Sequence, residues 1–120
     1  MAGKYNFDID QGSCSRFTFQ FQDDSKRQID LAGFEAAMQL RKVASSDEVV
    51  DTLTTENGRL VIDASAGSIQ VNFDSDTTEK YPARALVYDL EIESSDGNVT
   101  RVLEGMVKVN AEVTRVSRKR

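Results

Sequence analysis

Apolar and polar residues alternate one by one along most of this chain, and this feature most limits how it can fold. In residues 16–22, Phe17, Phe19 and Phe21 would lie on one side of an extended backbone, with the intervening polar residues on the other. A period of two matches a half-buried β-strand, whereas an amphipathic helix needs a period of about 3.6. The pattern therefore predicts a protein built mainly from strands.

The alternating segments are short, and turn-forming residues separate them. Asn57–Gly58 and the run Ser95–Asn98 are typical of hairpin turns. The segments follow each other at intervals of roughly 8–12 residues, a spacing typical of sandwiches and small barrels. We therefore expect an all-β fold, an antiparallel immunoglobulin-like β-sandwich of about seven to eight strands. The β-sandwich domain should span residues 1–110, and residues 111–120 should form a basic C-terminal tail.

One segment fits two interpretations. Residues 31–43 contain good helix formers, but Met38 and Leu40 also keep the two-residue alternation with Phe34. Gly33 would interrupt the start of a helix, and the neighbouring segments are strands. A strand is therefore the favoured interpretation of this segment.

A short break in the alternation lies between residues 74 and 81. Asp76 followed by Glu79 resembles a capping box, in which the side chain of the first residue caps a helix start. Pro82 disfavours helical backbone at the residue before it. We expect one helical turn here.

The composition excludes the commonest catalytic and metal sites. The chain has no histidine and one cysteine, Cys14. It therefore lacks the histidine that Ser-His-Asp and Cys-His nucleophile pairs require, the usual ligand sets for zinc, and the second thiol of an internal disulfide. Nothing near Cys14 would activate its thiolate.

The carboxylates give no clear catalytic or calcium site. Loops that begin at Asp8 and Asp74 have the opening spacing of a calcium loop, but Phe19 and Ala85 stand where a bidentate Glu is needed. Asp89 and Glu91 would share one face of a strand, and their alternation with core residues indicates a solvated face. We expect no catalytic, cofactor-binding or metal-binding residues and no enzyme activity.

Charge is unevenly distributed along the chain. The last six residues hold four of the fifteen basic residues, and all twenty acidic residues precede them. An acidic body repels nucleic acid and anionic membranes, so we expect neither as a partner. No stretch approaches the roughly 20 apolar residues of a membrane span, and the N-terminus lacks the apolar core of a signal peptide. We therefore expect synthesis in a cytoplasm.

Some strands carry apolar residues on both faces. In the last strand, Leu103, Val107 and Val109 share one face, yet Val102 and Met106 fall on the other. Such a pattern indicates that part of the outer surface is covered, although isolated surface valines are also common. The residues that we expect at subunit contacts are Val102, Met106, Val113, Arg115, Arg118, Lys119 and Arg120.

Three stretches of the chain resemble small tail and baseplate proteins of tailed bacteriophages. The first is Asp10–Ser13 leading into Phe17–Phe19, and the second is Gln28–Arg41, which is similar to the family's segment P-I-D-L-T-G-Y-x-A-x-M-Q-I-R. The third is Tyr88–Ile92 together with Asp96–Gly97, Thr100–Arg101 and Leu103–Gly105. Gln28 stands where proline is common in the family, so the turn there is expected to differ.

The resemblance implies a β-sandwich with a structural role in the virion and no enzyme activity. Similar modules form N-terminal domains of baseplate or receptor-binding proteins and lie in ring-like assemblies. It implies other virion proteins as partners, a homo-oligomer, and a protein made in the host cytoplasm. In such an assembly the basic tail would dock on the acidic body of an adjacent subunit.

Other functions remain open from the residues alone. An immunoglobulin-like module that binds carbohydrate or a cell surface is one alternative, but the chain has no tryptophan and most of its Phe and Tyr residues alternate into the core. A head decoration protein is another, because fold does not fix role. A small hydrolase that uses paired carboxylates is the most remote.

Overall fold

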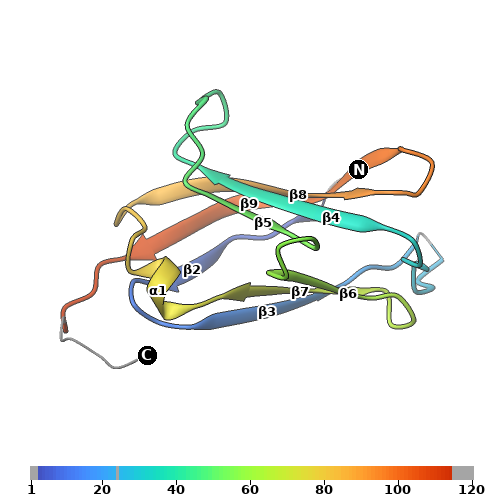
Figure 1. The fold of residues 1–120 in the computed structure, drawn as a ribbon, viewed down its shortest axis with the longest axis horizontal. Coiled ribbons are helices and arrows are strands. Elements are labelled where there is room, and N and C mark those ends of the chain that lie inside the picture. The colour runs from blue at the N-terminus through green and yellow to red at the C-terminus, as the bar shows by residue number, and fades with distance from the viewer. Residues whose placement is uncertain (1–2, 24, 115–120) are drawn as a thin grey trace.

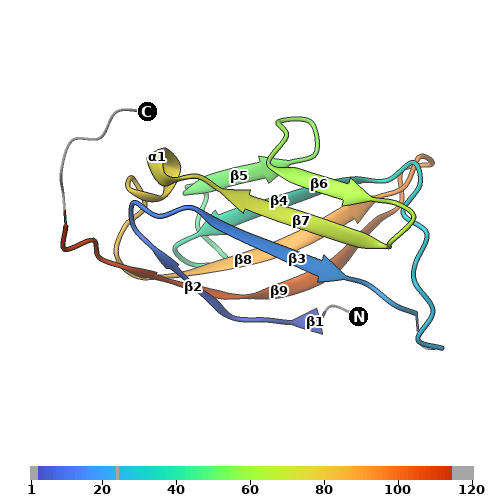
Figure 2. The same cartoon turned by 90° about the horizontal axis from the view of Figure 1, so that it is seen from below.

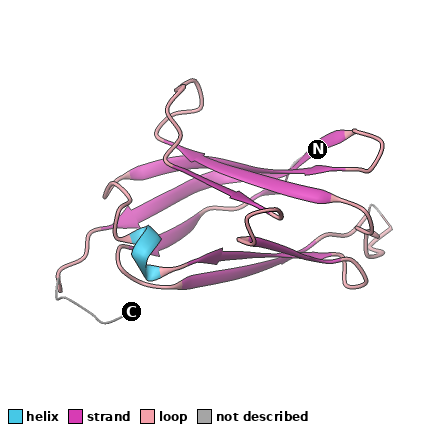
Figure 3. Cartoon of the chain, in the orientation of Figure 1, coloured by secondary structure: helices cyan, strands magenta, loops and turns pink. Residues whose placement is uncertain are grey.

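Residues 3–23 and 25–114, which the computed structural model describes, form two packed β-sheets and one short helix (Figure 1). Over these residues the fold is mainly β, and the two sheets do not close into a barrel. Figure 3 shows how little of the described chain is helical.

The larger sheet has six strands and the smaller one has three. The larger sheet contains β1 (Gly3–Lys4), β2 (Phe7–Asp10), β4 (Glu35–Arg41), β5 (Asp51–Thr54), β8 (Ala85–Glu93) and β9 (Val99–Asn110), in the order β1-β9-β8-β4-β5, with β2 also paired to β9. The smaller sheet contains β3 (Ser15–Gln20), β7 (Ser68–Phe73) and β6 (Leu60–Asp63), in that order. Within the described residues this makes nine strands, more than the seven to eight expected.

The expectation of a purely antiparallel fold is wrong for the larger sheet. Both β1 and β2 run parallel to β9, with Lys4 opposite Glu104 and Phe7 opposite Val107. The remaining pairs are antiparallel. Alternation fixes which residues face the core but not which strand becomes the neighbour, and these partners are about 100 residues apart. The sequence pattern therefore carried no information on this pairing.

The core lies between the sheets and follows the expected alternation. Leu86, Tyr88, Leu90 and Ile92 of β8 are buried, as are the inward residues of β7. Residues 35–41 form a strand, as predicted, and bury Ala36, Met38 and Leu40.

A tight turn leads into β4. Asp30 accepts a hydrogen bond of 2.9 Å from the backbone N–H of Ala32, and Leu31 enters the core. Gly33 has a φ of 79°, a backbone conformation that residues with a Cβ rarely adopt. A glycine is therefore required where the chain turns into β4.

Helix α1 (Ser75–Thr78) connects β7 to β8 at one end of the sandwich (Figure 1). A helical turn before Pro82 was expected, but its cap is Asp74 and not Asp76. The Asp74 carboxylate accepts a hydrogen bond of 2.8 Å from the N–H of Thr77, while Asp76 lies in the first turn. Asp74 directly follows β7 and keeps an extended backbone, which is the conformation that an N-cap requires.

The N-terminal segment is divided into two strands, β1 and β2. In the sequence Tyr5, Phe7 and Ile9 stand two residues apart, and an unbroken strand would place all three on the core face, but Tyr5 is 44% exposed. The chain leaves the sheet at Tyr5 and Asn6, and the Asn6 side chain accepts a 2.8 Å hydrogen bond from the N–H of Met106. A Cβ on Gly105 would collide with the carbonyl of Tyr5, so a glycine is needed where the backbone of Tyr5 lies against β9.

Candidate functional site

The outer face of the six-stranded sheet is the candidate functional site, because it holds the apolar residues that the core does not absorb. Outward side chains alternate with buried ones along β4, β8 and β9. Among them, Met106 is 49% exposed and Val87 is half-buried. The sequence prediction of an exposed Met106 on this face is confirmed.

Strand register aligns the outward side chains in rows across the sheet. One row runs from Gln39 through Asp89 and Glu104 to Lys4. Directly opposite residues on one face lie about 4.5–5.5 Å apart at Cβ. The row therefore joins four strands through polar side chains.

A second row is partly apolar. Arg41 lies opposite Val87, which lies opposite Met106. The two apolar side chains are therefore neighbours, with the cation of Arg41 beside them. This contact patch, defined as Arg41, Val87 and Met106, mixes an apolar centre with a charged rim.

A shallow groove of about 690 Å³ lies over these rows. Its walls include the contact patch, Asn6 and Lys4 on the N-terminal side, and Ala44 on the other side. Ala44 belongs to the β4–β5 loop, which projects beyond the sheet in Figure 1. The groove thus lies between this loop and the N-terminal segment.

Two arginines in the groove bond to neighbouring groups of this face and of the β4–β5 loop. Arg101 lies 3.3 Å from a carboxylate oxygen of Asp89 and 3.3 Å from one of Glu104. Arg41 donates hydrogen bonds to the Gln39 side chain at 2.8 Å and to the backbone carbonyl of Ser46 at 2.6 Å. These bonds fix the direction of both guanidinium groups, so the face presents an ordered pattern of both signs.

The other residues predicted at subunit contacts have different positions. Val102 does not share the outward direction of Met106: the β8–β9 register shifts between Leu90 and Glu91, and Val102 packs in part against the core. A bulge of one residue reverses the alternation beyond it. Val113 is 92% exposed. Arg115, Arg118, Lys119 and Arg120 lie outside the described residues.

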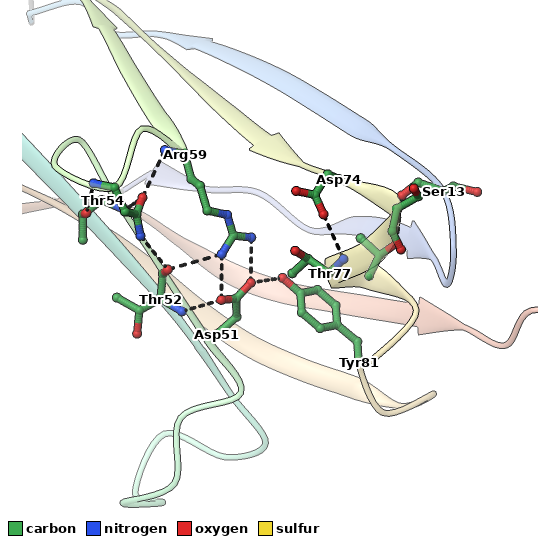
Figure 4. Close-up of polar contacts among 11 residues, drawn as sticks. Ser13, Asp51, Thr52, Thr54, Arg59, Asp74, Thr77 and Tyr81 are labelled. Atoms are coloured by element: carbon green, nitrogen blue, oxygen red, sulfur yellow. Dashed lines mark hydrogen bonds and ion pairs between the residues drawn. The ribbon is translucent and has the colours of Figure 1, made fainter. Parts of the chain in front are cut away.

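Sequence reasoning missed a second polar cluster, which joins the two sheets (Figure 4). Arg59 precedes β6, Asp51 begins β5, and Tyr81 lies in the β7–β8 connection. Arg59 donates one hydrogen bond of 2.7 Å to each carboxylate oxygen of Asp51, and the Tyr81 hydroxyl donates to the same carboxylate. The Asn57–Gly58 turn, which the sequence did reveal, brings Asp51 and Arg59 together.

Burial and hydrogen bonding set the protonation of this cluster. The hydrogen bond to Asp51 raises the pKa of Arg59, and this effect outweighs the desolvation that lowers it. Burial, followed by the hydrogen bond to Asp51, raises the pKa of Tyr81 well above its usual value. Arg59 stays cationic and Tyr81 stays a neutral donor, so the cluster clamps the two sheets together through a satisfied ion pair.

The carboxylates of the possible calcium loop at Asp8 and of the Asp89–Glu91 pair have ordinary surroundings. Asn110 donates to Asp8 at 3.3 Å and to Asp10 at 2.9 Å. Asp89 and Glu91 do share the outer face, as predicted, and Asp89 pairs with Arg101. In residues 3–23 and 25–114, no group of three or more Asp, Glu, Cys or His side chains is arranged to hold a metal ion.

Comparisons with known proteins leave the chain unassigned. No family model matches the sequence, and no curated protein matches it. As for membranes, no helix within the described part of the chain is long and apolar enough to cross one.

Proposed function

We propose that this chain is a non-enzymatic structural component of a bacteriophage virion, namely a tail, baseplate or fibre-attachment protein. It would be made in the host cytoplasm and would act by contacting other virion proteins and copies of itself. The observation that carries the proposal is the contact patch on the outer sheet face, where Val87 and Met106 lie next to an ordered set of charges. The resemblance of residues 10 to about 114 to phage tail and baseplate proteins supports it.

We also infer that the two sheets belong to an immunoglobulin-like sandwich. In that fold the B, E and D strands form one sheet and the C, F and G strands the other, with an added C′ strand in variable-type domains. The orders β3-β7-β6 and β5-β4-β8-β9 correspond to B-E-D and C′-C-F-G. The pairing of β1 and β2 with β9 places the first strand beside the last one.

The contact patch suits a stable protein partner whose charges are opposite to those around Val87 and Met106. Interfaces combine a buried apolar centre with a polar rim, and the rim charges select the partner more than they add affinity. Burying Val87 and Met106 would supply the apolar centre. The fixed guanidinium of Arg41 and the Arg101–Asp89 pair would select the partner.

Immuno-electron microscopy of purified particles tests this proposal. Antibodies against the chain are applied to tailed particles from a lysate of cells that express it. Label at the tail or baseplate is the expected result. Label on the head would replace it with the head-decoration alternative, and particles without label would overturn it. A glycan array with the same purified chain tests the carbohydrate-binding alternative.

A further inference from the structure

Strand β3 is an open edge of the three-stranded sheet. In the described part of the chain it pairs with β7 on one side and with no strand on the other (Figure 2). Just beyond its end, the N–H of Phe21 donates to the carbonyl of Gly67, the residue before β7. Residues whose backbone groups face a given neighbour alternate along a strand, so Phe17 and Phe19 direct theirs toward β7. The backbone groups of Arg16, Thr18 and Gln20 therefore point away from β7.

The polar side chains of β3 leave this edge uncovered. The Arg16 guanidinium donates to the Asn72 side chain at 3.0 Å, and the Gln20 amide donates to the carbonyl of Ala66 at 3.3 Å. Both acceptors lie toward β7 and the turn before it. Each side chain therefore leans inward across the sheet, and neither screens the edge.

Another edge of the molecule is blocked by its own side chains. On β5, the N–H of Thr52 donates to the carboxylate of Asp51 at 2.8 Å, and the N–H of Thr54 donates to the Asn57 side chain at 3.0 Å. The carbonyl of Thr52 accepts a further hydrogen bond of 3.1 Å from Asn57. An incoming strand would find these groups already used, as is common for protected edges.

Length and charge also distinguish β3 from the other edge strands. It has six residues, whereas β2, β5 and β6 have four each and β1, which also lacks an acidic residue, has two. Strands β2, β5 and β6 each contain at least one aspartate, and β3 contains no acidic residue. In a chain of twenty acidic and fifteen basic residues, a second copy meets the least repulsion here, and Arg16 would face a partner of net negative charge.

Incompletely buried aromatic rings lie behind this edge. Phe17 and Phe19 of β3 point toward the core but are only half-buried. Tyr5 packs edge-on against Phe19 with ring centroids 5.3 Å apart, and it remains substantially exposed. A strand added beside β3 would cover these rings as well as satisfy the open backbone groups.

We propose that β3 pairs antiparallel with β3 of a second copy, centred on Thr18, to give one continuous sheet across a two-fold axis. This rests on the proposed function, for which it names one partner and one surface. In this register Thr18 lies opposite itself, Arg16 lies opposite Gln20, and Phe17 lies opposite Phe19. No like charges meet, and the open N–H and C=O groups of both strands are used.

Thr18→Pro and Thr18→Ala separate backbone pairing from side-chain effects. Proline removes the N–H that faces the open edge, which an edge strand tolerates, whereas alanine keeps it. In sedimentation equilibrium we expect Thr18→Pro to raise the dimer dissociation constant by about 100-fold. The N–H of Thr18 in each copy donates across the axis, so the substitution removes two hydrogen bonds from the dimer. Thr18→Ala should change it less than about threefold. Equal dissociation constants for Thr18→Pro and the wild-type protein would overturn the proposal.

A cross-link tests the register without proline. In a Cys14→Ser background, Thr18→Cys places two thiols at a Cα separation of about 5.5 Å across the axis, within disulfide range. We expect mild oxidation to give a covalent dimer. Gln70→Cys in the same background, one strand further from the edge, should stay monomeric. Absence of the Thr18→Cys dimer, or equal cross-linking of both variants, would overturn the proposal.

These results are distinguishable from failure of the proposed function. The virion role stands and the β3 pairing is wrong if particles carry the chain while Thr18→Pro leaves the dissociation constant unchanged and Thr18→Cys gives no covalent dimer. If the β3 pairing holds but purified particles lack the chain, the dimer is real and the virion role is wrong.

Discussion

Arg59 holds the carboxylate of Asp51 through two hydrogen bonds of 2.7 Å each, and this ion pair joins the six-stranded sheet to the three-stranded one. The side chains are 23% and 15% exposed, so solvent screens the pair only in part. The Tyr81 hydroxyl donates to the same carboxylate from a third segment. The cluster ties together β5, the start of β6 and the β7–β8 connection.

Removing Arg59 should destabilise the fold measurably. In Arg59→Met the Asp51 carboxylate keeps Tyr81 but loses both charge-assisted hydrogen bonds, and we expect a loss of about 2 kcal/mol in the free energy of unfolding. Urea unfolding measures it. The control is Arg101→Met, whose side chain is 53% exposed in its pairs with Asp89 and Glu104 and should cost under about 1 kcal/mol. Equal losses for the two variants would contradict the clamp.

Alkaline pH should weaken the fold through its buried tyrosines. Burial raises the pKa of Tyr81 and of Tyr88 above the usual value of about 10. The folded state then holds these protons more tightly than the unfolded state does. This stability is fully present below pH 10 and is lost as the pH rises beyond it.

Urea unfolding midpoints at pH 8 and at pH 11 measure this loss. Tyr81→Phe removes one of the two groups, so its stability should fall less between these pH values than that of the wild-type protein. The Tyr81→Phe, Tyr88→Phe double variant should fall least. An unchanged pH slope in both variants would show that other groups cause the alkaline loss.

Gly105 should tolerate no side chain. A Cβ there would collide with the carbonyl of Tyr5, which also accepts a 2.6 Å hydrogen bond from the Tyr88 hydroxyl. Gly105→Ala should therefore displace the N-terminal segment and cost about 2 kcal/mol in urea unfolding. Gly3→Ala is the matched control, because its nearest neighbours lie at 3.7 Å. A loss below about 0.5 kcal/mol in Gly105→Ala would contradict the close approach of the Tyr5 carbonyl to Gly105.

Met106→Glu tests the contact patch. A charge at the apolar centre of an interface weakens it, and we expect incorporation of the variant into particles to fall at least about tenfold. Val61→Glu is the control, since Val61 has the same 49% exposure but lies on the other sheet. Quantitative mass spectrometry of purified particles gives both values. Similar incorporation of the two variants would show that the contact patch does not bind a partner in the particle.

Much of the fold could be predicted because alternation reports burial directly. The strand at residues 35–41 and the buried face of β8 follow from the period of two, even where residues such as Met38 and Leu40 also suit a helix. The Asn57–Gly58 turn and the glycine at position 33 follow from local backbone preferences. These features depend on neighbours in the sequence.

The features that could not be predicted depend on distant residues. The parallel pairing of Phe7 with Val107 joins residues 100 positions apart, and the carbonyl of Tyr5 lies against Gly105 of β9, equally distant in the sequence. The bulge at Val102 reverses an alternation that the sequence shows as continuous. Of the candidate site, the alternation places Met106 on the face away from the core, but its row with Arg41 follows only from strand register.

The molar mass of the purified chain in solution tests most directly whether this protein works by assembling. Light scattering after size-exclusion chromatography is measured over a concentration series. We predict a discrete species heavier than the 13.3 kDa chain, whose population grows with concentration and which Thr18→Pro removes. A mass of 13.3 kDa at every concentration would contradict self-association through β3.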